Sequence, residues 1–303
     1  MAKVVRYLRD EQKEFQRLFS DLCDTKSSWQ VWADFVECAA IAISNSVDRV
    51  SRQREEREAR YMRIMQTYRE PERRCFGELF TIMVNALEAM PNQDFLGEMF
   101  MALELSNHWK GQFFTPYCVC ECMAKCSLQD VEAHIERRGW VGVSDPACGA
   151  GALMIAARNE FARRGIGFRQ TLYVCQDIDT VAGLMCYIQL SLLGCAGYVV
   201  IANSLTHPVC GISPILPIIK PDQDFWFTPM FYDEVWQGRI RWSMLDMAVR
   251  QMAGESSTAV ATAPAEPKPA EPSVTMEEKK RPAERQETAQ VLNMDATGQL
   301  SFF

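Results

Sequence analysis

Two apolar strand patterns flank a glycine-rich turn and a helical pattern between residues 140 and 175. Residues 140–144 lead into Asp145-Pro-Ala-Cys-Gly-Ala-Gly151, residues 152–163 form the helical pattern, and residues 171–175 form the second strand. Two parallel strands joined by a helix make a βαβ unit, the building block of doubly wound sheets. The order predicts an α/β fold with a Rossmann-like domain.

The turn itself indicates a bound ligand. Gly149 and Gly151 carry no Cβ, so a ligand can approach the backbone, and the following helix presents free N–H groups. A nucleotide-like cofactor is the chemistry that such a turn favours. A Gly-x-Gly sequence alone is also compatible with a simple tight turn.

An acid stands at the end of the second strand, in Gln176-Asp-Ile-Asp179. In doubly wound folds, an acid at this place faces the crevice above the first turn and binds ribose hydroxyls. We predict that Asp177 has this role. The alternative is a helix cap for the helix that begins near residue 180, and Asp179 fits that role better.

The rest of the chain divides by composition into three parts. Residues 1–105 show helical spacing of apolar residues and predict a helical domain, followed by the α/β domain over residues 106–253. Residues 254–303 are rich in Ala, Pro, Glu and Lys and poor in aromatics, which predicts a disordered tail. An arginine-rich helical pattern near residues 49–63 is interleaved with glutamates, so a solvated face is favoured over a phosphate-binding one.

Charge and cysteine usage restrict location and partners. The net charge of −7 argues against a protein that coats nucleic acid by bulk charge, although a local basic groove stays open. The sequence starts without a secretory signal, so we expect a cytoplasmic protein whose twelve cysteines are reduced. Residues 181–201 are apolar, but glycines and polar residues interrupt them, which favours a buried helix and strand over a membrane span.

Three motifs in this order resemble one family. Gly111-Gln-Phe-Phe-Thr-Pro116, the glycine-rich turn and Gln176-Asp-Ile-Asp179 are similar to the S-adenosylmethionine half of the adenine-N6 DNA methyltransferases, particularly the modification subunits of type I restriction-modification systems. The resemblance covers roughly residues 106–208 and extends more loosely into the helical N-terminal region. It implies S-adenosylmethionine as cofactor, DNA as substrate, and a specificity subunit as a partner.

The resemblance also implies which residues hold the cofactor: Gln112, Phe113, Thr115, Asp145, Cys148, Gly149, Gly151, Asp177 and Asn203. The first three would contact its methionine end, and Asp145 with the turn from Cys148 to Gly151 would lie against its amino acid and sulfonium. Asp177 would bind the ribose hydroxyls. Asn203 stands where the family often has an acid beside the adenine amine.

The catalytic motif departs from the family pattern. The family has Asn-Pro-Pro-Phe or Asp-Pro-Pro-Tyr after its fourth strand, and this chain has neither. The most similar segment, residues 224–231, would place Thr228, Pro229 and Phe231 at the catalytic positions. In the family, hydrogen-bond acceptors at these positions bind the target amine, and the aromatic side chain stacks on the extruded base. The resemblance implies adenine-N6 methylation. Because the catalytic motif differs, the alternative is a catalytically silent binding module. The surrounding aromatic residues are typical of a hydrophobic core or of base stacking.

The last five residues resemble the pentapeptide by which bacterial proteins bind the replication sliding clamp. Gln299, Leu300, Ser301, Phe302 and Phe303 would supply a polar anchor and apolar side chains. The alternative is a terminus that folds back on its own domain.

No metal site is predicted. Cysteines 118, 122 and 126 share one face of a helical pattern without zinc-ligand spacing, which favours buried thiols that pack one helix.

Overall fold

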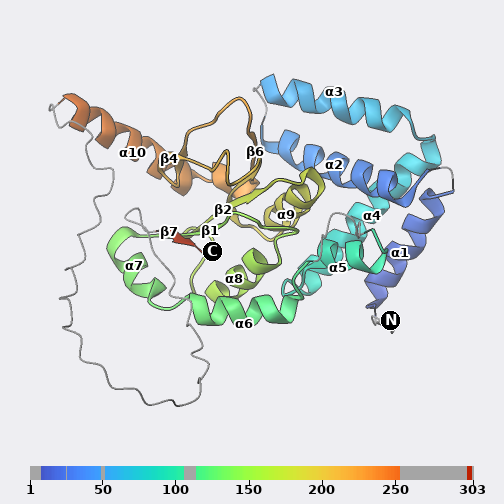
Figure 1. The fold of residues 1–303 in the computed structure, drawn as a ribbon, viewed down its shortest axis with the longest axis horizontal. Helices are drawn as coiled ribbons and strands as arrows, with labels where there is room; N and C mark the ends of the chain where they lie inside the picture. The colour runs from blue at the N-terminus through green and yellow to red at the C-terminus, as the bar shows by residue number, and fades with distance from the viewer. Residues whose placement is uncertain (1–7, 25, 49–51, 106–113, 253–298, 302–303) are drawn as a thin grey trace, which may run out of the picture.

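The computed structural model describes residues 8–24, 26–48, 52–105, 114–252 and 299–301. It shows an N-terminal group of helices packed beside a mixed α/β region (Figure 1). The predicted fold class is thereby confirmed. The predicted tail, apart from its residues 299–301, lies outside the described residues.

Helices of the described part fill the chain before the first strand: α1 (Asp10–Leu22), α2 (Ser28–Val47), α3 (Arg52–Gln66), α4 (Glu70–Ala89), α5 (Phe95–Ala102), α6 (Tyr117–Ser127) and α7 (Val131–Arg138). Their core is aromatic, because Phe15 meets Trp32 and Phe95 edge to face at centroid distances of 6.1 and 5.5 Å. Helix α2 also packs on α9, so this core continues into the α/β region.

The main sheet contains β1 (Val141–Asp145), β2 (Thr171–Asp177), β3 (Ala196–Ile201), β6 (Asp224–Phe227) and β7 (Gln299–Ser301), in the order β6-β3-β2-β1-β7. All neighbours are parallel except β6, which runs antiparallel to β3. Helix α8 (Ala152–Arg163) joins β1 to β2, and α9 (Thr180–Leu192) joins β2 to β3. The predicted βαβ unit is present.

The sheet separates two apolar layers. Because strand side chains alternate, Tyr173 and Cys175 of β2 join the core of α8, α9 and the N-terminal helices, whereas Leu172 and Val174 face the other layer. That second layer contains Phe231 of the 3-10 helix η1 (Pro229–Tyr232) and the first turns of α10 (Glu234–Met252). A separate hairpin of β4 (Gly211–Ser213) and β5 (Leu216–Pro217) follows β3.

The aromatic residues around the predicted catalytic segment form a core. Phe225, Trp226 and Trp236 have no exposed surface. The guanidinium of Arg57 in α3 lies 3.7 Å from the Trp226 ring centroid, donates to the Phe225 carbonyl at 2.8 Å and pairs with Asp224 at 3.1 Å. This buried cation fastens α3 to the edge strand β6.

The thiols of α6 are placed differently from the expectation. Cys118, Cys122 and Cys126 are exposed, so the prediction that they pack the helix is wrong. The face that packs on α8 instead carries Cys120 and Ala124, which are four residues apart. None of the described helices is both long and apolar enough to cross a membrane.

The end of the chain lies beside the first strand. Gln299–Ser301 forms β7 and pairs in parallel with Gly142 to Ser144 of β1. This agrees with the alternative of a terminus folded back on its own domain. Binding to a sliding clamp stays a prediction, and Phe302 and Phe303 lie outside the described residues.

Candidate functional site

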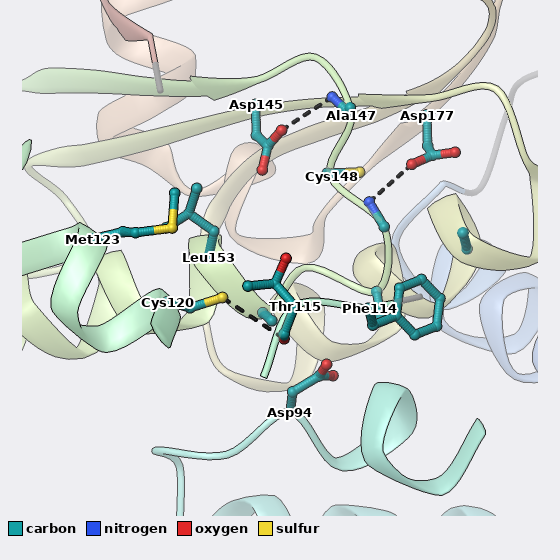
Figure 2. Close-up of a pocket in the computed structure, with 14 residues that line it drawn as sticks. Asp94, Phe114, Thr115, Cys120, Met123, Asp145, Ala147, Cys148, Leu153 and Asp177 are labelled. Atoms are coloured by element: carbon teal, nitrogen blue, oxygen red, sulfur yellow. Dashed lines mark hydrogen bonds between the residues drawn. The ribbon is translucent and has the colours of Figure 1, made fainter. Parts of the chain in front are cut away.

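A cavity of about 230 Å³ lies where β1 and β2 end, as the topology of a parallel sheet predicts (Figure 2). The strand ends bring Asp145 and Asp177 to it, and the turn between β1 and α8 forms one wall. The opposite wall comes from Asp94 and from Phe114 and Thr115, which precede α6. The structure thus brings together most of the predicted cofactor-binding residues; Gln112 and Phe113 lie outside the described part.

The turn requires glycine at both predicted positions. Gly149 and Gly151 have φ angles of +53° and +94°, which disfavour other residues. A Cβ on Gly151 would lie 2.9 Å from the Sγ of Cys186, and one on Gly149 would lie 3.1 Å from the Phe114 ring. The backbone of the turn therefore packs closely between α9 and Phe114.

Asp177 holds this turn in place. Its Oδ2 accepts a hydrogen bond from the Gly149 N–H at 2.8 Å, and its Oδ1 accepts one from the Asp179 N–H at 2.9 Å. Each oxygen keeps a further lone pair for a ligand hydroxyl. Asp179 caps α9 by accepting from the N–H groups of Val181 and Ala182, as the sequence predicted.

Three carboxyl groups line the cavity, and none is paired with a cation there. Asp145 is 3% exposed, and burial raises its pKa to about 7. Burial likewise raises the pKa of Asp94 to about 6 and that of Asp177 above its usual value. No Lys, Arg or His is among the described residues that line the cavity. Such a carboxylate set favours a ligand that carries positive charge.

The same pKa values predict how the folding stability of the ligand-free protein changes with pH. A carboxyl group whose folded pKa is raised binds more protons in the folded than in the unfolded state between about pH 4 and its folded pKa. Asp94 and Asp145 therefore make the empty protein less stable as the pH rises from about 4 to about 7. A cationic ligand offsets this loss.

Asp94 and Gln189 were not predicted. Gln189 of α9 is fully buried; its Nε2 donates to Asp94 at 2.7 Å and to the Ala150 carbonyl at 2.9 Å, while its Oε1 accepts from the Leu96 N–H. This amide joins the helical region to the glycine-rich turn. The sequence signal for Asp94 is its position before α5, where its carboxylate accepts from the Gly97 N–H as an N-cap.

Asn203 does not reach the cavity. Its Oδ1 accepts hydrogen bonds from the N–H groups of Leu205 and Thr206, so the side chain stabilises the turn that follows β3. A role beside the adenine amine is not supported by this placement, because Asn203 is not among the lining residues.

The predicted catalytic segment lies at the opposite edge of the sheet. Because β6 is antiparallel to β3, the end of β6 lies beside the start of β3, about 13 Å along the strand from its carboxyl end. Thr228 is fully buried there; its Oγ1 donates to the Cys195 carbonyl at 2.7 Å and accepts from the Gly197 N–H at 3.0 Å. Pro229 and Phe231 continue into η1, away from the cavity. The pairing therefore places Thr228, Pro229 and Phe231 at the other end of the strands from the cavity, and the structure does not bring the predicted catalytic residues to the predicted cofactor-binding ones.

Thr228→Val is expected to lower the free energy of unfolding by about 2 kcal/mol, because it leaves the buried Gly197 N–H and Cys195 carbonyl without this partner. Thr228→Ser keeps the hydroxyl and should retain most of the stability. Urea unfolding followed by circular dichroism measures both. If Thr228→Val left stability unchanged but abolished a methyl-transfer activity, the structural role would be refuted.

Among the described residues, no group of three or more His, Cys, Asp or Glu side chains is placed to hold a metal ion.

Comparisons with known proteins bear on the family. Residues 93–238 match the family model described as N-6 DNA Methylase, which confirms the predicted resemblance over that part of the chain. One similar solved structure, from Listeria monocytogenes, is named as a class I S-adenosylmethionine-dependent methyltransferase; it is 16% identical, with a TM-score of 0.35, over 66% of this chain and 56% of that chain. The match thus spans little more than half the length of that protein. No curated protein matches the sequence.

Proposed function

We propose that this chain, which belongs over residues 93–238 to the N-6 DNA methylase family, transfers a methyl group from S-adenosylmethionine to the N6 amine of adenine in DNA. The observation that supports it best is the cavity at the ends of β1 and β2, where a glycine turn meets the buried carboxyl groups of Asp94 and Asp145 and the half-buried one of Asp177. Recognition of the target sequence by a partner subunit belongs to the same proposal.

The residues present fit the cofactor. S-adenosylmethionine supplies a methyl group activated on a positively charged sulfur, and it carries an α-ammonium group and a ribose. Asp177 has lone pairs for the ribose hydroxyls, and its bond to the Gly149 N–H holds the glycine-rich turn as a wall of the cavity. Asp145 and Asp94 supply the negative charge that a cationic ligand requires.

Binding is expected to release protons below neutral pH. The pKa of Asp145 is about 7, so this group is largely protonated at pH 6, and a cation in the cavity favours its ionised form. Affinity for S-adenosylmethionine should therefore rise between pH 5.5 and 7.5. Calorimetry in two buffers of different ionisation enthalpy measures the released protons directly. Asp145→Asn should abolish most of this release, and a flat affinity across this range would contradict the prediction.

Methyl transfer itself is tested with labelled cofactor. The purified chain is incubated with methyl-labelled S-adenosylmethionine and with adenine-containing duplexes and single strands, and the DNA is digested to nucleosides. We expect label in N6-methyladenine with the wild-type chain and none with Asp177→Ala. Label in another base, or none from a protein that binds cofactor, would refute the proposed reaction.

A second candidate function is a cofactor-binding module that transfers no methyl group. It is favoured by the burial of Thr228 at the sheet edge opposite the cavity, together with the missing family tetrapeptide. Cofactor binding by calorimetry without methyl incorporation in the assay above is the result that selects it.

A further inference from the structure

Asp94 is a carboxylate that the helical region places against the cavity. It is 3% exposed and precedes α5, and its Oδ1 accepts both of its hydrogen bonds, from the Gly97 N–H at 3.0 Å and from Gln189 Nε2 at 2.7 Å. Its Oδ2 accepts no hydrogen bond from any described residue. Asp94 lines the cavity, so a donor group of a bound ligand can supply the partner that Oδ2 lacks.

The position of Asp94 separates it from the other two acids. Figure 2 shows Asp94 on one side of the cavity and Asp145 and Asp177 on the other, with Thr115 between Asp94 and Asp145. Asp177 already serves the glycine turn, where a ribose would lie. Asp94 thus lies on the side of the cavity opposite Asp177.

Two neighbouring residues, Gly97 and Gln189, fix the position of the Asp94 carboxylate. A Cβ on Gly97 would lie 2.0 Å from Asp94 Oδ2, so the carboxylate occupies space that only a glycine leaves free. Gln189 fixes Oδ1 and donates to Ala150 in the turn, which couples Asp94 to the opposite wall. Nearby Glu98 is itself paired with Arg9 at 2.7 Å, so Arg9 is engaged by Glu98, and no described cation forms an ion pair with Asp94.

We propose that Asp94 binds the α-ammonium group of the methionine part of the cofactor. The inference rests on the proposed cofactor, and it assigns to the helical region a direct part in binding. An ammonium group supplies three donors and a full positive charge, which match a carboxylate that lines the cavity and whose Oδ2 accepts no hydrogen bond from the described residues. Asp177 would then bind the ribose, and Asp145 would lie against the sulfonium.

The test compares three ligands by calorimetry on the full chain. S-adenosylmethionine carries the ammonium and the sulfonium, S-adenosylhomocysteine carries only the ammonium, and 5′-methylthioadenosine carries neither. Asp94→Asn keeps an oxygen that can accept from Gly97 and Gln189. We expect it to weaken the first two ligands by the same factor, about tenfold or more, and to leave the third unchanged. Glu88→Gln, an exposed substitution in α4, is the matched control and should change none.

A stability measurement separates binding from a merely structural role. Because the substitution removes a buried charge, the melting temperature of ligand-free Asp94→Asn should equal or exceed that of the wild type. Asp94→Ser, which preserves a capping oxygen, serves if the first variant fails to fold. Weakening of S-adenosylmethionine alone, equal weakening of all three ligands, or no weakening would each overturn the assignment. If the wild-type chain bound none of the ligands, the proposed function would fail instead.

Discussion

Asp177→Ala is expected to weaken S-adenosylmethionine binding by about a hundredfold or more. In the proposed binding mode the carboxylate accepts from the ribose hydroxyls, and two charge-assisted hydrogen bonds there would be worth about 3 kcal/mol together. The substitution also removes the acceptor for the Gly149 N–H, so the turn loses the bond that holds it beside β2. Both effects lower affinity, and calorimetry measures their sum.

Asp222→Ala is a matched control at the same end of the sheet. Asp222 is about half exposed, pairs with His207 at 2.7 Å and does not line the cavity, so its loss should leave affinity unchanged. 5′-methylthioadenosine adds a second check, because it keeps the ribose. Asp177→Ala should weaken it as well, in contrast to Asp94→Asn. Unchanged affinity of Asp177→Ala for both ligands would remove the cofactor assignment.

Gly197→Ala is expected to cost more than about 3 kcal/mol of folding stability and to lower the melting temperature by about 10 °C or more. A Cβ at this position would lie 1.9 Å from the Tyr173 carbonyl oxygen, which is backbone of the neighbouring strand and cannot rotate away. Gly197 also exchanges backbone and side-chain hydrogen bonds with Thr228, so a shift of β3 would disturb β6.

The same substitution at Gly77 is the control. Gly77 lies within α4, and nothing is within 4 Å of a Cβ built there. Alanine is the better helix former, so Gly77→Ala should raise stability by about 0.5–1 kcal/mol. Thermal unfolding of the two variants side by side gives the comparison. A Gly197→Ala protein that melts within 2 °C of the wild type would contradict the close packing of β2 and β3.

The sequence predicted correctly those features that depend on residues close together along the chain. The apolar spacing that predicted helices in residues 1–105 reflects burial of one helix face, and that face is the aromatic core seen around Phe15 and Trp32. The glycine turn and Asp177 could be placed together because consecutive parallel strands must end at the same edge of a sheet. The turn and the acid line one cavity for this reason.

Contacts between segments that are distant in sequence could not be predicted from local sequence patterns. Asp94 and Gln189 are 95 residues apart, and only the packing of α5 on α9 brings them within 2.7 Å. No periodicity in either segment encodes that pairing. The three motifs that carried the resemblance began at residue 111, so the only local signal for Asp94 was that of a helix cap.

The direction of strand β6 determines where the predicted catalytic residues lie relative to the cavity. A strand pattern over residues 224–227 carries no information about whether it pairs in parallel or antiparallel, because side chains alternate in both cases. The amino acids alone therefore determined the βαβ unit, its ligand-binding turn and the acid beside it, since these depend on short-range order along the chain. Tertiary packing decided that Thr228 is a buried link between β3 and β6 and that Asp94 joins the cavity, because both outcomes depend on which surfaces meet in space.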